Sequence, residues 1–187
     1  YLDDPHYKAD HDEVRSDGAL HSTTRTPDQT VVGHYWAYDG VSGLGTPPRL
    51  YNQVLRAIVA NRGTPVDDQA ELFAQANVAM ADAGVEAWYW KYYYNLWRPV
   101  IGIREASAND GPSGVAGANT TPDCDPFWLP HGAPNSNQTS RPDFTPPFPA
   151  YPSGHATFGA AMLGTIRLFF GGAPISVAEV LSPSPAA

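Results

Sequence analysis

The chain has 187 residues, 42% of them hydrophobic, which is enough for a domain with a buried core. Its formal net charge of −8 argues against a nucleic-acid binder, which needs a basic face. The sequence holds no apolar run of the ~20 residues that a membrane span requires. Its single cysteine, Cys124, excludes an internal disulfide and a multi-thiolate metal site within these residues.

The first helix that the sequence predicts follows a polar N-terminal stretch. Residues 1–35 are polar, and we expect them to be irregular, with residues 21–30 as a loop. A helix then runs through Leu50, Val54 and Ile58, which recur at helical spacing, and Gly63 is its stop signal.

The clearest helical pattern begins at Val66. An apolar stripe steps by three and four residues along it, through Phe73, Ala76, Met80, Ala83, Ala87, Trp90, Tyr94 and Trp97. Gly84 interrupts the pattern and is tolerable if a neighbouring helix packs closely there. Pro99 disfavours helical geometry at Arg98, so we expect the helix to end there.

Residues 102–152 are rich in Gly, Pro and Ser and predict a long loop region, of the kind that is usually functional or a linker. A second apolar helix follows over residues 155–170, with Gly171 and Gly172 at its end. Neither internal repeats nor convincing alternating strands are found. The sequence therefore predicts a mainly α fold and a single helical domain over residues 1–187.

Two cations stand out in the segment "KYYYNLWRP". Lys91 and Arg98 are seven residues apart, so on one helix they share nearly the same azimuth, roughly 10 Å apart along the axis. Two long side chains can close that gap and converge on one tetrahedral or trigonal-bipyramidal anion. The alternative, left open by this spacing alone, is a pair of ordinary surface cations.

The segment "PSGH" begins the helix at 155–170. Ser153 suits the N-cap, Gly154 permits close backbone approach, and the helix offers amide donors and a positive dipole end. This is a general design for binding anions, and His155 adds a titratable group beside it. The alternative interpretation is a capped helix with a surface histidine.

Together these two segments resemble the first two signature motifs of the vanadium-dependent haloperoxidases and the phosphatidic-acid-phosphatase-type acid phosphatases. The family pattern is K-x6-R-P, then P-S-G-H, then S-R-x3-G-x-H. Longer stretches, among them "WYWKYYYNLWRPVIGIRE" and "PPFPAYPSGHATFGAAML", are similar to the chloroperoxidase branch and cover most of residues 34–170. The resemblance implies a helical-bundle haloperoxidase-type fold that is incomplete in this chain.

The resemblance also implies a site. Vanadate, or phosphate in its place, is held by Lys91, Arg98, the Ser153 hydroxyl and the Gly154 amide. The catalytic residues are His155, as acid–base, and Lys91, which polarises the bound peroxide. The substrates implied are hydrogen peroxide and a halide, and the product is hypohalous acid or a halogenated organic compound.

Three further positions match the family in its outer parts. Trp88 and Phe148 correspond to positions that shape the halide side of the pocket in chloroperoxidases. Asp39 resembles an acidic residue that pairs with the arginine of the third motif.

The third motif, S-R-x3-G-x-H, does not occur in the sequence, and with it the axial histidine ligand of vanadium is missing. We expect a second polypeptide, or a C-terminal segment separated by cleavage, to supply it. An oligomer is compatible with this, and the family implies a secreted, extracellular or periplasmic protein. An acid phosphatase and a non-catalytic anion-binding subunit are the alternatives.

Overall fold

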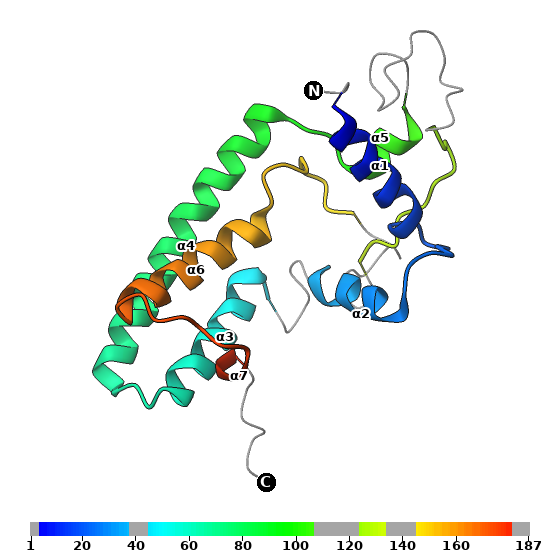
Figure 1. Ribbon diagram of the computed structural model, residues 1–187. Helices are drawn as coiled ribbons and strands as arrows, with labels where there is room; N and C mark the ends of the chain where they lie inside the picture. The colour runs from blue at the N-terminus through cyan, green and yellow to red at the C-terminus, as the bar shows by residue number, and fades with distance from the viewer. Residues whose placement is uncertain (1–3, 38–44, 107–123, 134–144, 181–187) are drawn as a thin grey trace. The chain divides into compact units, whose positions relative to one another are not determined.

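The computed structural model describes residues 4–37, 45–106, 124–133 and 145–180. Within these residues the chain forms seven α-helices and no β-strand beyond an isolated bridge between Ala19 and Pro130. The helices are α1 (Pro5–Asp17), α2 (Pro27–Trp36), α3 (Pro47–Asn61), α4 (Val66–Tyr94), α5 (Pro99–Arg104), α6 (Gly154–Phe169) and α7 (Val177–Val180) (Figure 1). The predicted mainly α fold is confirmed.

The chain divides into two compact units. The first comprises Tyr1–Ser42 and Asn95–Ala150 and holds α1, α2 and α5. The second comprises Gly43–Tyr94 and Tyr151–Ala187 and holds the other four helices. That residues 1–187 act as a single domain stays a prediction.

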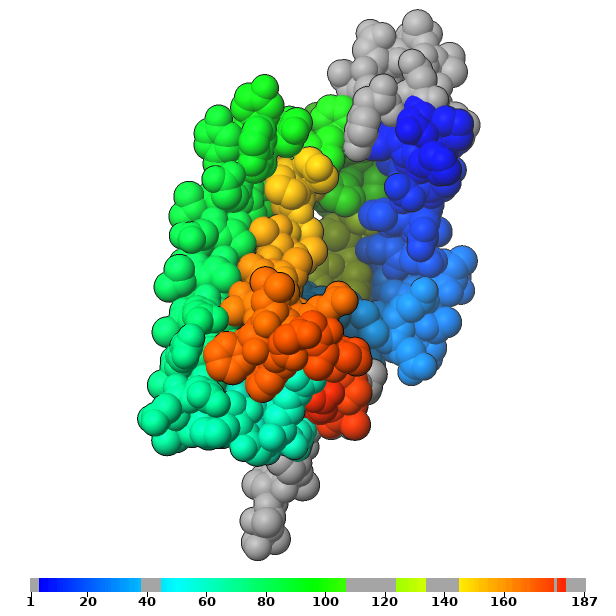
Figure 2. Space-filling view, turned by 60° about the vertical axis from the view of Figure 1, so that its left-hand side comes forward, coloured from blue at the N-terminus to red at the C-terminus, as the bar shows by residue number. Residues whose placement is uncertain are grey.

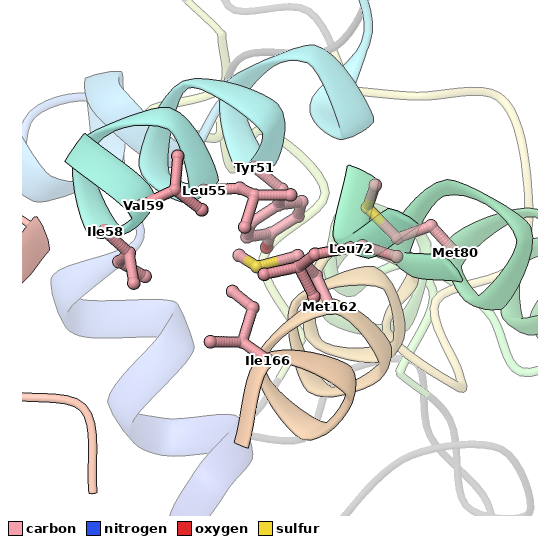
Figure 3. Close-up of a cluster of buried hydrophobic side chains, with 9 residues drawn as sticks. Tyr51, Leu55, Ile58, Val59, Leu72, Met80, Met162 and Ile166 are labelled. Carbon is pink, nitrogen blue, oxygen red and sulfur yellow. The ribbon is translucent and has the colours of Figure 1, made fainter. Parts of the chain in front are cut away.

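The core of the second unit lies where α3, α4 and α6 meet. In Figure 1 α6 runs beside α4, and in Figure 2 their surfaces adjoin. Figure 3 shows the cluster that they bury between them. Its members are Tyr51, Leu55, Ile58 and Val59 from α3, Leu72, Ala76 and Met80 from α4, and Met162 and Ile166 from α6.

Helix α3 forms as its sequence predicts. The buried positions Tyr51, Leu55 and Ile58 are four and three residues apart, so they share one face. The helix ends at Asn61, and Gly63 follows with a φ of 60°, a left-handed conformation that glycine adopts without strain.

Helix α4 ends earlier than its apolar pattern predicts. It stops at Tyr94, and Asn95 then takes a positive φ of 48°. Arg98 is extended, with φ −70° and ψ 150°, because the ring of Pro99 disfavours the helical region for the residue before it. Pro99 itself begins α5. The expectation that Lys91 and Arg98 lie two turns apart on one helix is therefore wrong.

The buried face of α4 also differs in part from the predicted stripe. Ala76, Met80 and Ala87 are buried as predicted. Beyond Ala87 the buried face advances by four residues to Lys91, whereas Trp90 is 38% exposed. The first fully buried position of the helix is Leu72, whereas the predicted stripe began at Phe73. A charged side chain thus occupies the last buried position of an otherwise apolar face.

Helix α6 packs on α4 at the glycine that interrupts the α4 pattern. A Cβ at Gly84 would lie 2.7 Å from a ring carbon of Phe158, so the bare backbone admits the aromatic ring. This confirms the close helix packing expected there. At the other end, Gly171 and Gly172 follow the helix with φ of 66° and 87°, as the stop signal predicts.

The first unit contains two helices where the sequence predicted irregular structure. Asp4 caps α1 by accepting from the His6 amide, and Pro5 occupies the first turn. Thr26 and Gln29 form a reciprocal capping box at α2, where Pro27 is again in the first turn. The expectation for residues 1–35 was wrong because α1 is a polar helix, and because in α2 the apolar pairs Val31/Tyr35 and Val32/Trp36 span too few turns to set a clear pattern.

One side chain fastens the connection between these two helices. Arg25 donates from Nη1 to the carbonyl oxygens of Asp17 and Ala19, both at 2.6 Å, and from Nε to the Thr30 hydroxyl at 3.0 Å. The guanidinium thereby satisfies carbonyls beyond the last turn of α1.

The region predicted as a long loop contains the short helix α5, which ends at Arg104. Its other described parts, residues 124–133 and 145–153, carry no helix. Among the described residues, no helix has both the length and the apolar character that crossing a membrane requires.

Candidate oxyanion-binding site

The start of α6 combines a cap with an exposed backbone donor. The Ser153 hydroxyl oxygen accepts from the Ala156 amide at 3.3 Å, so it uses a lone pair and keeps its O–H as a donor. The Gly154 amide is the first of the helix and has no acceptor within it. Both donors lie at the positive end of the helix dipole, where a negative charge is stabilised.

Helix α4 brings two of the expected residues to this helix start. A Cβ at Gly154 would lie 2.9 Å from two ring carbons of Trp88 and 4.0 Å from Cε of Lys91. The close approach of the indole is possible only because residue 154 has no side chain. Trp88, Lys91 and Gly154 are therefore neighbours, as the resemblance implies.

Lys91 is buried beside an aromatic ring. It is 1% exposed, and its Nζ lies 5.6 Å from the centroid of the Trp88 ring, within the range of a cation–π interaction. A lysine, a serine hydroxyl and a backbone amide at a helix start are the kinds of group that bind an oxyanion. The donor set therefore fits vanadate or phosphate.

His155 follows Gly154 in the first turn of α6, with a backbone contact that the sequence did not indicate. The hydroxyl of Tyr51 donates to the His155 carbonyl oxygen at 2.7 Å. Tyr51 shares the buried face of α3 with Leu55 and Ile58, and this spacing was the available signal that it points inward.

Arg98 and Phe148 lie together in the first unit. The Nε of Arg98 donates to the Phe148 carbonyl oxygen at 2.7 Å, and its guanidinium carbon lies 4.7 Å from the centroid of the Phe148 ring. The amide of Ala150 donates to the Leu96 carbonyl oxygen at 2.9 Å, which joins the same two segments. The structure thus pairs the predicted arginine with a predicted halide-pocket residue.

The expected residues therefore fall into two groups. Trp88, Lys91, Ser153, Gly154 and His155 belong to the second unit, and Arg98 and Phe148 to the first. Asp39, the remaining expected residue, lies outside the described residues.

Comparisons with known proteins agree with the mainly helical fold. Residues 71–183 match the family model described as the VCPO second helical-bundle domain. The vanadium chloroperoxidase of Curvularia inaequalis is 45% identical over 163 residues, which cover 82% of this chain and 25% of that protein. No solved structure matches.

The matched family model covers more than half of the chain, including α6 and most of α4. The chain belongs to the vanadium haloperoxidase family, in its chloroperoxidase-like branch. It spans about a quarter of the length of the curated relative that it matches.

Proposed function

We propose that this chain forms part of a vanadium-dependent haloperoxidase, which oxidises halide with hydrogen peroxide to hypohalous acid or halogenated organic products. The observation that carries the proposal is the buried ammonium of Lys91 beside the side-chain-free Gly154 at a helix start. This arrangement joins a cation to backbone and hydroxyl donors, which is what an oxyanion cofactor requires.

Vanadate, when bound, would supply Lewis-acid activation of peroxide without a change of its own oxidation state. Lys91, Arg98, the Ser153 hydroxyl and the Gly154 amide would hold it. Because Lys91 is buried, the attraction of its ammonium for developing negative charge would be weakly screened by water.

His155 would handle the proton. The imidazole can accept a proton from hydrogen peroxide and return it when the product leaves. Trp88 and Phe148 would flank the halide and keep water from its side of the site. Asp39 would pair with the arginine of the family's third motif, S-R-x3-G-x-H.

Substitution of His155 by alanine tests this assignment. We expect vanadate binding to persist, because the holding groups remain, and halogenation to fall by a factor of about 10² to 10⁴, the usual contribution of a general acid–base. Vanadium content is measured by elemental analysis and turnover with peroxide and bromide. Unchanged turnover in H155A would refute the role.

An acid phosphatase is the second candidate, because phosphate matches vanadate in charge and shape and the same donors would hold it. The indole of Trp88 over Gly154, together with the Phe148 ring beside Arg98, favours the haloperoxidase. Hydrolysis of a phosphate monoester without peroxide would indicate the phosphatase, and binding of phosphate with neither reaction would indicate a non-catalytic anion-binding subunit.

A further inference from the structure

A tyrosine of α3 reaches the same turn of α6 that carries the proposed acid–base. The Tyr51 side chain is 7% exposed, and its hydroxyl donates to the His155 carbonyl oxygen at 2.7 Å. Figure 3 shows Tyr51 projecting from α3 into the core between the helices. A Cβ at Gly159 would lie 3.1 Å from the Tyr51 hydroxyl oxygen and 3.2 Å from two ring carbons, so the absence of a side chain at 159 makes room for the phenol.

This hydrogen bond does more than satisfy a buried hydroxyl. The carbonyl of His155 has two lone pairs, one for the helix ladder of α6 and one for the phenol. Contacts within α6, such as the Ser153 cap, fix only local helix geometry. The bond from Tyr51, together with the packing of Trp88 against Gly154, fixes where the first turn of α6 lies relative to the other helices.

The neighbouring residue of α3 fastens that helix to α4. Asn52 and Asn77 exchange two side-chain hydrogen bonds, each 2.9 Å long. Consecutive residues of α3 therefore contact α4 and α6, the two helices that carry Lys91 and His155. One turn of α3 therefore holds both helices by hydrogen bonds.

We propose that Tyr51 is a positioning residue, which holds the Gly154–His155 turn at its distance from Lys91 and Trp88. This inference rests on the proposed function for its effect on halogenation. Its structural content, the placement of an oxyanion-binding turn from α3, applies to any oxyanion bound there.

The variant Tyr51→Phe tests it in the native protein, since phenylalanine keeps the ring and removes only the hydroxyl. We expect faster amide hydrogen exchange over residues 153–157 and a loss of about fivefold in inorganic phosphate affinity, the factor that one ordinary neutral hydrogen bond gives. Halogenation should lose kcat by a similar factor with the halide KM unchanged, because Tyr51 contacts the His155 backbone rather than substrate.

The matched control is Ile58→Val, a buried change on the same face of α3 that destabilises the core by removing one methylene. I58V should leave exchange at 153–157, phosphate affinity and kcat as in the parent. Equal effects of Y51F and I58V would show that general destabilisation is responsible, and would overturn the inference.

A second variant changes Gly159, the residue of α6 that lies against the Tyr51 phenol. Gly159→Ala favours the helix by its intrinsic propensity but drives a methyl group against the phenol. We expect G159A to weaken phosphate binding, because the methyl group shifts the phenol away from its present hydrogen-bond geometry with the His155 carbonyl oxygen. Parent-like phosphate affinity in both Y51F and G159A would overturn the positioning role.

These readouts separate the two proposals. A native protein without vanadium or halogenation, in which Y51F still weakens phosphate binding, would refute the haloperoxidase function and support the positioning role. A halogenating protein in which Y51F leaves exchange, phosphate affinity and kcat unchanged would support the haloperoxidase function and refute the positioning role.

Discussion

Gly154 is the residue at which the chemistry of the site and the packing of α6 meet. Its amide faces the open end of the helix, and the place of its missing side chain is taken by the Trp88 indole. A hydroxyl, an amide and an ammonium can converge here because nothing projects from residue 154.

Substitution of Gly154 by alanine should therefore weaken anion binding. The new methyl group would need to displace Trp88 ring carbons 2.9 Å away, and with them the approach of Lys91. We expect at least a tenfold loss of phosphate affinity, measured by calorimetry, as a displaced turn forfeits about 1.4 kcal/mol or more of hydrogen bonding and charge interaction.

Gly164→Ala is the matched control, because it lies in the same helix and a Cβ there meets nothing within 4 Å. This variant should bind phosphate as the parent does and gain about 0.5–1 kcal/mol of stability, the usual advantage of alanine in a helix interior. Equal affinity in both variants would contradict the importance of the Trp88 approach.

The positions of some site residues were predictable from the sequence, and those of others were not. The neighbourhood of Lys91, Trp88 and Gly154 agrees with what the motifs imply. The near burial of Lys91 was predictable from its four-residue step beyond Ala87, but Arg98, which was expected on the same helix, is extended and precedes α5. Tyr51 was not singled out, because its contact with His155 joins residues 104 positions apart and no local pattern records it.

At the scale of elements, the C-terminal helix α7 is held to α3 by charge. Arg62, at the end of α3, donates from Nε to a Glu179 carboxylate oxygen at 2.5 Å. The other Glu179 carboxylate oxygen accepts from the Ser176 amide at 2.7 Å, and the Glu179 amide donates to the Ser176 hydroxyl oxygen at 3.4 Å, which together form a capping box. The Arg62 guanidinium and the Ser176 donors lower the Glu179 pKa from 4.5 to about 2.

This lowered pKa predicts the pH range in which Glu179 stabilises the fold. The contribution is fully present above the unfolded-state pKa near 4.5 and is lost as pH falls through about 2, because the unfolded chain then takes up the proton more readily. The difference in melting temperature between the parent and Glu179→Gln should thus be constant near neutral pH and shrink below about pH 4.5.

The control for this prediction is the Arg62→Gln variant. In that variant, a further E179Q substitution should change the melting temperature much less, and with a weaker pH dependence, since the main partner is already absent. A Glu179 carboxyl that titrates by NMR near its ordinary value would contradict the prediction.

The helices also show which local sequence signals predict where a helix begins and ends. The end of α3 and both ends of α6 were predictable because glycine stops and a serine cap act locally. Helices α1 and α2 were missed although Asp4-Pro5 and Thr26-Pro27 are start signals of the same kind. Helix α1 is polar and α2 has apolar residues over little more than one turn, so hydrophobic spacing did not reveal them, and capping chemistry was the more informative signal.

At the scale of the whole molecule, the second unit is discontinuous in sequence. Helices α3 and α4 are joined by residues 62–65, whereas residues 95–153 separate α4 from α6, its main packing partner. No local sequence pattern predicts that pairing, because the two helices are separated by residues 95–153 and periodicity describes only one helix at a time.

The discontinuity predicts an order of folding. Closing the long connection costs about 2 kcal/mol more in chain entropy than closing a four-residue one. We therefore expect α3 and α4 to be formed in the folding transition state before α6. Matched exposed substitutions test this: Ala74→Gly in α4 should mainly slow refolding, and Ala160→Gly in α6 should mainly speed unfolding. The reverse pattern in stopped-flow kinetics would contradict it.

Because residues 95–153 lie between α4 and α6, the residues of the site are synthesised at different times. Lys91 and Trp88 emerge from synthesis early, and Ser153, Gly154 and His155 only after the whole intervening segment. Until α6 has packed, the Gly154 turn is not beside Lys91, so a nascent or partly folded chain lacks the proposed oxyanion site. Binding of an oxyanion there would thus have to wait until the second unit has reached its native packing.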